Sequence, residues 1–582
     1  MLFRKPRGIA LIIAFLVIVV LLILGSIFIL RSVGEKYAGS KEKASIQAFF
    51  LAEAGANVGL NKIDLFINTD MLTTVNNTNP NTLVNRLTKN PNYIGNGNGI
   101  GFLVDYTKKE GVKQFTLVEN GAGNDDDEAV YSVSATALGN GSYDYNVTIT
   151  EKGNPQEVAE DKWDFPYNYT ITATGTVEST PRQVVLKGDF TVRVQRDNFA
   201  RYALFTDHHR LESGTTVWFT NRTHFYGPTH TNERFSFAWN PSGTFDGLVT
   251  QHNNNARFYN NGSAVLLNAD SNPPRDVPTF NAGFNRGVDE IVLASSVQKQ
   301  DLQEQAWGGV PGTVPNGIYV NNNGTSLTGG IYVKGNCTMN MGVDVNGNAT
   351  YNITRGTTAK IITVDYGDEA VIGDEQTTVQ TVGGPTNTYS GVPDGIEDVG
   401  TIIYVDGEVS SLAGTVQKNS QVTISSENDI IIQNNILYEE YTPGSGTPGE
   451  PGYVPPTAED KTNLLGMLSW GGDVRIGTSA PDDISIHGTV MARNGVFTVD
   501  QYNFGDPRGA ATLLGGVITQ FYGAFGQFNS VTGQQVHGYG RNFIYDARMA
   551  AGQSPPYFPT MRTFIAFTND ITDRITWQEG AI

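Results

Sequence analysis

Five of the seven histidines fall within one stretch of the chain, and imidazole is a common ligand of transition metals. Asp207 and several aromatic residues lie among them. Imidazole nitrogens bind Zn²⁺ and aromatic faces stack on sugars, so this stretch is a candidate metal or carbohydrate site. No HExxH or other compact ligand spacing is present, which favours histidines in turns and at corners instead. The residues are His208, His209, His224, His230 and His252, with Trp218, Phe219, Phe225 and Tyr226.

A second group of residues carries carboxylates, the groups that cleave glycosidic bonds when two of them lie about 5 to 10 Å apart. Neighbouring acids in a turn point in alternating directions and rarely form such a pair. The motifs typical of pectinase-type β-helices are absent. We therefore expect no enzymatic activity, and a polysaccharide-active β-helix enzyme is the least favoured alternative. The acids considered are Asp365, Asp368, Glu369, Asp482 and Asp483.

One acidic turn is a candidate calcium site. Its sequence is Gly391-Val-Pro-Asp-Gly-Ile-Glu-Asp398, which resembles the Asp-Gly-x-x-Asp turns of extracellular calcium repeats. Ca²⁺ prefers carboxylate oxygens, so Asp394, Glu397 and Asp398 are the candidate ligands. A single copy of the turn also suits a solvated surface loop. We expect no other cofactor.

The elements that position these residues begin with an apolar N-terminal segment. Ile9 to Leu30 carries no charge and, at about 1.5 Å per helical residue, is long enough to cross a bilayer. Arg4, Lys5 and Arg7 precede it, and basic residues stay on the cytoplasmic side. The sequence predicts a single-pass protein of the inner membrane with its N-terminus inside and its ectodomain in the periplasm or outside the cell. A removable secretory signal and a plain type II anchor are the alternatives.

Two short motifs flank this segment. Lys5-Pro-Arg-Gly8 precedes it, and Ser45-Ile-Gln-Ala-Phe-Phe-Leu-Ala-Glu-Ala-Gly-Ala-Asn-Val-Gly-Leu60 follows it. Together they resemble the N-terminal region of PilX-type minor pilins and related pseudopilins. The resemblance implies a leader, residues 1–8, that a prepilin peptidase cuts between Gly8 and Ile9, and a filament-core helix over 9–65. It also implies other pilins or pseudopilins as partners.

Ile13 narrows the class of pilin that the chain resembles. Most major pilins carry Glu at the fifth position after the cut, whereas some minor components, such as the tip pseudopilin of type II secretion, do not. A buried carboxylate that could pair with a neighbour's N-terminal amine is missing here. The substitution therefore favours a minor component over a repeating shaft subunit.

The periodicity of the same helix predicts two faces. Small residues recur every four positions and permit close helix approach, whereas the bulkier Ile46, Phe49, Phe50 and Val58 are expected to seat the helix on its own globular domain. An ordinary amphipathic stalk, in which alanine only raises helix propensity, is the alternative. The expected packing residues are Ala44, Ala48, Phe49, Ala52, Glu53, Ala54 and Gly55, and the stripe continues through Ala56 and Gly59.

Composition narrows the class of fold and partner. The chain has 582 residues, 66 of them glycine, and only 17% are charged, which favours short strands and turns. A net charge of −19 argues against nucleic acid as a partner. The single cysteine, Cys337, excludes an internal disulfide.

The remaining chain divides into two regions with different sequence patterns. Residues 66–200 are expected to form a pilin-like α+β head with an antiparallel sheet, because Tyr145–Thr150, Tyr167–Val177 and Gln183–Gln195 are rich in β-branched and aromatic residues. Residues 201–560 alternate short apolar triplets with Gly and Asn turns, for example Gly317-Ile-Tyr-Val320 and Gly330-Ile-Tyr-Val333. This pattern predicts a right-handed parallel β-helix, with a β-sandwich or jelly roll as the alternative.

Two smaller segments complete the predicted organisation. Residues 441–457 are rich in Pro, Gly and Ser and are expected to form a flexible exposed loop. Residues 561–582 are expected to form a strand that caps the end of the β-helix.

The sequence as a whole therefore predicts a mainly β protein with a long N-terminal helix. The favoured function is a non-enzymatic minor pilin or pseudopilin that joins, primes or decorates a type IV pilus or type II secretion-like filament. Its ectodomain would bind a surface polysaccharide or a host or abiotic surface. A permanently anchored cell-surface binding protein is the alternative.

Overall fold

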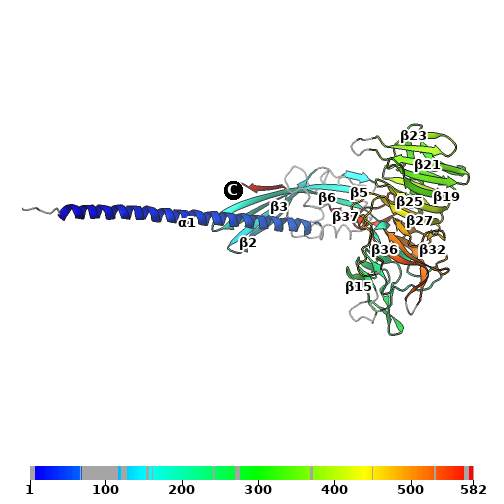
Figure 1. The fold of residues 1–582 in the computed structure, drawn as a ribbon, viewed down its shortest axis with the longest axis horizontal. Coiled ribbons are helices and arrows are strands. Elements are labelled where there is room, and N and C mark those ends of the chain that lie inside the picture. The colour runs from blue at the N-terminus through cyan, green and yellow to red at the C-terminus, as the bar shows by residue number, and fades with distance from the viewer. Residues whose placement is uncertain are drawn as a thin grey trace, which may run out of the picture. The chain divides into compact units, whose positions relative to one another are not determined.

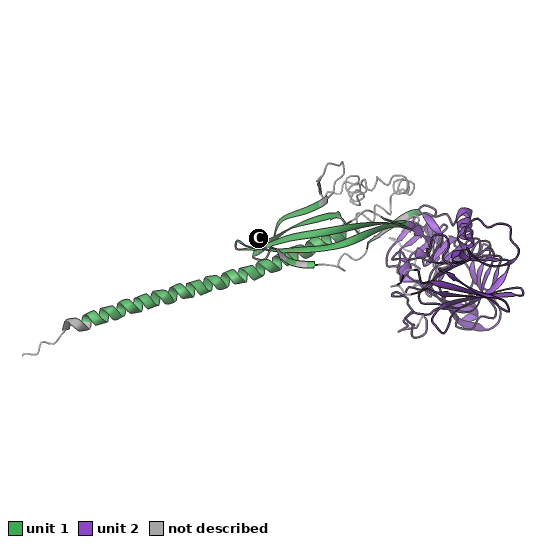
Figure 2. Ribbon diagram, turned by 90° about the horizontal axis from the view of Figure 1, so that it is seen from above, with its two compact units in different colours: residues 1–195, 563–582 green, residues 196–562 purple. Residues whose placement is uncertain are grey.

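The computed structural model describes residues 7–65, 67, 116–118, 128–152, 156–159, 162–239, 243–268, 276–367, 371, 373–448, 450–529, 533–568 and 576–580. Within these ranges the protein is mainly β with one long N-terminal helix, which confirms the coarse fold class that the composition predicts. The chain divides into two compact units (Figure 2). Unit 1 contains residues 1–195 and 563–582, and unit 2 contains residues 196–562.

Unit 1 begins with α1 (Arg7–Leu65) (Figure 1). Residues 11–43 are exposed throughout. From Ala44 onward one side of the helix is buried against strands of the same unit, and Ala48, Ala52, Ala56 and Ile63 have no exposed surface. The helix therefore has an apolar half without contacts in the described chain and a second half that is docked.

The docked half of α1 packs on an antiparallel sheet, which we call the head sheet. Its strand order is β1-β2-β3-β5-β6-β37, and β4 and β38 pair at the margins with β5 and β6. In β5 every second residue is buried, including Trp163, Phe165, Tyr167 and Tyr169, so one face forms the core with α1. The bounds are β1 (Thr116–Val118), β2 (Glu128–Leu138), β3 (Gly141–Glu151), β4 (Gln156–Ala159), β5 (Lys162–Val177), β6 (Thr180–Asn198), β37 (Thr560–Thr568) and β38 (Thr576–Gly580).

The predicted antiparallel strands are therefore present, since β3, β5 and β6 contain the three expected segments and pair antiparallel. The helical part expected early in 66–200 falls almost entirely on residues 66–115, of which only Ile67 is described. The strand expected within 561–582 is present as β37 and β38. Both strands pair with β6 in the head sheet, so the expectation that this segment covers the end of the β-helix is wrong.

Unit 2 contains two large sheets. Sheet 1 has the strand order β16-β12-β9-β7-β34-β31-β28-β26-β24-β18-β17, and its strands pair parallel except for the last pair. The bounds are β7 (Leu204–His208), β9 (Thr229–Thr231), β12 (Val249–Gln251), β16 (Phe284–Arg286), β17 (Gly317–Asn322), β18 (Leu327–Lys334), β24 (Thr401–Asp406), β26 (Gln421–Ser426), β28 (Leu464–Ser469), β31 (Thr489–Ala492) and β34 (Val517–Phe521).

Sheet 2 has the order β23-β22-β21-β20-β19-β25-β27-β30-β33-β36-β35, with β29 beside β27 and β32 beside β29. The strands from β19 to β36 pair parallel along this path, whereas β19 to β23 form antiparallel hairpins. The bounds are β19 (Cys337–Val343), β20 (Ala349–Arg355), β21 (Thr358–Asp365), β22 (Gln376–Thr381), β23 (Thr386–Ser390), β25 (Val409–Val416), β27 (Ile430–Tyr438), β29 (Val474–Ile476), β30 (Ser485–His487), β32 (Phe497–Val499), β33 (Pro507–Leu514), β35 (Gly526–Phe528) and β36 (Gln535–Ile544).

From β24 onward the chain alternates between the two sheets. Each strand of sheet 1 pairs parallel with the next strand of sheet 1 in the sequence, as Ile403 with Ile424 and Thr423 with Gly466 show. Inward-facing aliphatic residues of both sheets then form one continuous core. The short apolar triplets of the sequence form the strands that alternate between the two sheets.

A strand from the start of unit 2 joins the two runs of strands in sheet 1. β7, the first strand of sheet 1 in the sequence, pairs parallel on one side with β9 and on the other with β34, the last strand of sheet 1. Leu204 lies opposite Val517, and Phe205 lies opposite Ile518. We call this pairing the seam. Sheet 1 is thus continuous although it is built from two separate runs of the chain.

Sheet 1 finishes in an antiparallel hairpin at one end, β17 with β18, and in the parallel strand β16 at the other. A second hairpin, β13 (Ala256–Asn260) with β14 (Ser263–Leu267), lies beside β10 (Ser236–Phe237) in a separate small sheet. The two similar segments Gly317–Val320 and Gly330–Val333 therefore pair as a hairpin, with Tyr319 opposite Tyr332, and not as two stacked coils. The hairpin at the β17 end limits the unpaired parallel edge that would otherwise invite other strands.

Candidate functional site

The docked half of α1 approaches the head sheet closely because small residues meet at the contact. A methyl group on Gly175 of β5 would overlap the backbone of α1 at Ala48 and Ala52. Gly55 and Gly59 of α1 lie in turn against Ala173 and Ile171 of β5. The large aromatic residues of this core come from the sheet, so the helix contributes the small ones.

The assignment of the two helix faces from periodicity is therefore wrong. The alanine stripe packs on the protein's own sheet, and the bulky side faces outward. Ile46, Phe50 and Val58 are 53%, 60% and 37% exposed. Phe49 alone among the bulky residues packs against the core, and Glu53 and Ala54 lie half-buried at the margin of the stripe.

The N-terminal half of α1 is a candidate membrane span or signal sequence by length and composition. Its most apolar window has a mean hydropathy of 3.4, and none of it is buried. Gly8 and Ile9, the expected processing residues, lie in the first turn of α1. The rest of the expected leader, residues 1–6, lies outside the described chain.

The five clustered histidines do not converge on one site. His209 lies inside unit 2, where its ring contacts Phe219, Phe235 and Tyr522. Burial and the nearby Arg541 charge lower the pKa of His209 to about 3. Phe219 and Phe225, expected beside a ligand, are also core residues. No group of three metal-ligating side chains occurs among the described residues.

His230 is buried in a hydrogen-bond network on sheet 1. Its Nε2 lies 2.9 Å from Asn232 Oδ1, and its Nδ1 lies 2.8 Å from Thr250 Oγ1. The same Asn232 oxygen accepts a hydrogen bond from the backbone of Ile291, so it is an acceptor and His230 Nε2 must be the donor. This hydrogen bond places a proton on Nε2, and burial lowers the pKa of the ring to about 4.

The other three clustered histidines lie near the surface on different strands. His208 contacts Glu233 at 3.1 Å, His252 contacts the carbonyl of Val288 at 2.8 Å, and His224 contacts Asp246 at 2.7 Å. Asp207 accepts a hydrogen bond from Asn232.

The candidate calcium residues lie in one turn, but the turn is occupied by protein contacts. Glu397 accepts a hydrogen bond from Gln305 at 2.8 Å, and the Tyr557 hydroxyl donates to the carbonyl of Asp394. Burial and the nearby charge of Asp398 raise the pKa of Asp394 to about 6. Asp398 itself has a positive φ of 52°. The structure brings no metal-holding group together here among the described residues.

The candidate catalytic acids are likewise turn residues. Asp482 accepts a hydrogen bond from Arg508 at 3.1 Å, and Asp483 accepts one from the backbone of Ala510 at 2.9 Å. Asp365 accepts one from the backbone of Gly367 at 3.0 Å. Asp368 and Glu369 lie outside the described residues. Asp365 thus stabilises its own turn, whereas Asp482 and Asp483 connect their turn to the start of β33.

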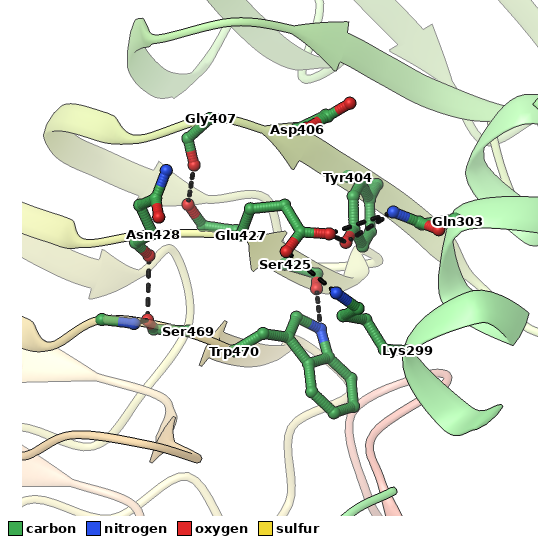
Figure 3. Close-up of polar contacts among 12 residues, drawn as sticks. Lys299, Gln303, Tyr404, Asp406, Gly407, Ser425, Glu427, Asn428, Ser469 and Trp470 are labelled. Carbon is green, nitrogen blue, oxygen red and sulfur yellow. Dashed lines mark hydrogen bonds and ion pairs between the residues drawn. The ribbon is translucent and has the colours of Figure 1, made fainter. Parts of the chain in front are cut away.

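A polar cluster that sequence patterns did not indicate fixes α5 (Ser296–Trp307) to sheet 1 (Figure 3). Glu427 at the end of β26 receives donors from Lys299 and Gln303 of α5, both at 3.0 Å, and from Tyr404 of β24. Burial and the adjacent carboxylate raise the pKa of the Tyr404 phenol. The apolar side of α5, Leu302 and Ala306, packs beside this cluster.

This cluster has a structural role. Both carboxylate oxygens of Glu427 already hold donors, so Glu427 is not positioned as a catalytic base. Because α5 packs on the outer face of sheet 1 at β18 and β24, β24 is buried on both faces. The only sequence signal for α5 was its capping box, Ser295 with Gln298.

Comparisons with known proteins give one partial match. A family model, a domain of unknown function (DUF4900), matches residues 164–253, from β5 of the head sheet through β12 of sheet 1. No curated protein and no solved structure gave a significant match to the chain.

Proposed function

We propose that this protein is a non-enzymatic minor pilin-like or pseudopilin-like subunit of a type IV pilus or type II secretion-like filament. The observation that carries the proposal is the division of α1 into a wholly exposed apolar half and a half docked on an antiparallel sheet. An apolar helix of this length must lie in a bilayer or against other apolar helices. The leader and the Ala-Glu-Ala-Gly motif support both environments in sequence: α1 lies first in the bilayer and later against other apolar helices.

In this proposal α1 is stored in the inner membrane with its N-terminus inside and then moves into a filament. Ile46, Phe50 and Val58 give α1 a second exposed apolar face, which the charged segment 31–43 separates from residues 11–30. Neighbouring pilin or pseudopilin helices would cover that face, while the alanine stripe holds the subunit's own head.

Unit 2 is the displayed part of the subunit. Its alternating parallel strands support the interpretation as a parallel β-helix, for which we propose the usual right-handed sense. The contacts made by Asp482, Asp483 and Glu427 favour binding over catalysis. Display of so large a unit favours a low copy number, at a filament tip or along its surface.

The test is the N-terminal sequence of the protein from membranes and from sheared surface material, with and without a prepilin peptidase. We expect the mature chain to begin at Ile9, to require the peptidase and to occur in the sheared material. Gly8→Val should prevent the cut. Gly39→Val is the matched control, because an added side chain there meets no atom within 4 Å.

The alternative functions predict different results. An intact Met1 confined to the membrane would contradict the filament proposal and support a permanently anchored cell-surface binding protein. A chain cut downstream of residue 30 and free in the medium would indicate a secretory signal instead.

A further inference from the structure

Three short strands of unit 2 place a set of aromatic and polar side chains on one outward surface. They are β8 (His224–Phe225), β11 (Thr244–Phe245) and β15 (Thr279–Phe280), which pair parallel in the order β15-β11-β8. Phe225, Phe245 and Phe280 occupy matching positions and belong to or pack against the core. Because side chains alternate along a strand, the residues on either side of these phenylalanines face outward.

The outward residues contact one another in a defined way. The rings of His224 and Tyr226 stack with centroids 4.0 Å apart and an interplanar angle of 30°. His224 Nε2 lies 2.7 Å from Asp246 Oδ2, and the amide of Asn281 donates to Asp246 Oδ1 at 2.6 Å. The side chains of His224 and Asp246 are 43% and 35% exposed. A carboxylate with a donor on each oxygen is held in one orientation, and it remains accessible.

The same surface continues onto β36. The amide of Asn542 donates to the Tyr453 hydroxyl at 2.6 Å and to Thr512 Oγ1 at 3.1 Å. Gly227, next to Tyr226, lies directly against the ring of Tyr545, which follows β36. Burial, together with the nearby Tyr453 and Asp246, raises the pKa of Tyr226.

Tyr453 belongs to the segment 441–457 that was expected to be a flexible loop. Its described part instead forms antiparallel bridges between Thr442 and Thr457 and between Ser445 and Val454. The hydrogen bond from Asn542 then fixes the tip beside β36. The loop therefore contributes an oriented aromatic ring to the surface.

We propose that this surface, the tyrosine–aspartate stripe, binds a neutral polysaccharide chain. Aromatic rings stack on the apolar faces of pyranose sugars. An oriented carboxylate accepts hydrogen bonds from sugar hydroxyls, and the imidazole and the amide beside it can donate to others. The stripe carries a carboxylate within a chain of net charge −19, which disfavours an acidic polysaccharide. The stripe consists of His224, Tyr226, Asp246, Asn281 and Tyr453, and the buried Asn542 holds Tyr453 in place.

This inference names the ligand class of the displayed unit and rests on the proposed function for its biological setting. Binding itself needs neither processing nor a filament. It can therefore be measured on the purified full-length chain in detergent, so failure of either proposal leaves the other standing.

The experiment is isothermal titration of the full-length protein with cellohexaose, N-acetylchitohexaose, mannohexaose and maltohexaose, and with hexagalacturonate as the acidic probe. We expect at least one neutral hexasaccharide to bind, and to bind more tightly than hexagalacturonate. Tyr226→Ala and Asp246→Ala should each weaken that binding at least tenfold. Tyr259→Ala is the control, because Tyr259 is a 39% exposed tyrosine of β13 outside the stripe.

Thermal unfolding of each variant separates binding from folding. If Tyr226→Ala lowers the Tm, the exposed Asn281→Ala decides, and at least a threefold loss of affinity is expected there. The proposal is overturned if no neutral hexasaccharide binds the native chain, if hexagalacturonate binds most tightly, or if Tyr259→Ala weakens binding as much as Tyr226→Ala does.

Discussion

At the scale of single residues, unit 2 keeps several histidines uncharged. His209, His230 and His487 are all buried, and burial lowers each pKa, to about 4 for His230 and His487. A buried imidazole must lose its proton before it can be enclosed, whereas in the unfolded chain it titrates near its ordinary value. Unit 2 is therefore linked to pH through groups that take no part in binding.

The pH dependence has a definite sign. Between about pH 4 and 6.5 the unfolded chain binds more protons than the folded one, so stability is fully present above pH 6.5 and falls as the pH falls through this window. We expect His230 alone to account for a loss of about 2 kcal/mol between pH 7 and pH 5. Chemical unfolding of unit 2 at pH 7 and at pH 5 measures this loss of stability.

A histidine variant isolates the effect. His230→Gln should be less stable at pH 7, because the hydrogen bonds with Asn232 and Thr250 are disturbed, but its stability should change less between pH 7 and pH 5. His252→Gln, at an exposed position, should retain the native slope. An unchanged slope in His230→Gln would contradict the assignment.

Gly175 gives a second prediction at this scale. A larger side chain would overlap the backbone of α1, and overpacking of this kind costs about 1–3 kcal/mol. We expect Gly175→Val to release the docked half of α1, seen as faster amide exchange from Ala44 to Ile63. Gly39→Val on the exposed part of the helix should leave exchange in that segment unchanged.

At the scale of elements, the sequence predicted which strands and which helix form more accurately than it predicted which face of the helix packs on the sheet. The alternation in β5 and the length of α1 are local properties and were predictable. The face of α1 that docks was not, because the choice depends on the partner. Where the stripe meets β5, the sheet presents Gly175, Ala173 and Ile171, and the helix and strand approach so closely that only small helix residues fit.

The corrected faces of α1 predict opposite effects for two substitutions. Phe50→Ser, on the 60% exposed side, should leave the Tm of unit 1 unchanged and reduce recovery of the protein in sheared surface material. Ala52→Leu, on the buried stripe, should lower the Tm by overpacking the core. Equal effects of the two variants on the Tm would contradict the faces given by the structure.

The cluster around Glu427 is an element-scale contact that sequence patterns could not locate, because its members come from positions 299, 303, 404 and 427. Glu427→Ala should leave Lys299 and the Tyr404 phenol without their acceptor and lower the stability of unit 2 by about 1–3 kcal/mol. Asp301→Ala, at an exposed position of the same helix, serves as the control. Denaturant unfolding at pH 7 measures both, and equal losses would argue against the cluster.

At the scale of the whole molecule, unit 2 is an insertion between β6 and β37, two neighbouring strands of the head sheet. The two connections meet at one place in unit 2, where the backbone of Phe199 donates to the carbonyl of Pro559 at 3.2 Å. No local pattern could predict the β6–β37 pairing, since the partners are separated by the whole of unit 2. The pairing of β7 with β34 at the seam could not be predicted either, because these two strands are also far apart in the sequence.

Truncation tests this architecture. Removing residues 563–582 should expose the edge of β6, so amide exchange in β6 should become faster. Exchange in β24, β26 and β28 should stay as in the native protein, because those strands belong to unit 2 and lose no partner. Faster exchange in unit 2 comparable to that in β6 would contradict the division into two units.

The insertion also sets an order of events during synthesis. The edge of β6 emerges from the ribosome before most of unit 2, whereas β37 and β38, which pair with that edge, follow only after the whole of unit 2. The head sheet consequently stays incomplete while unit 2 is being made, and a chain terminated within unit 2 retains an open β edge. Such an edge is a site of aggregation. The position of β37 and β38 thus makes the closing of the head sheet depend on prior synthesis of the whole of unit 2.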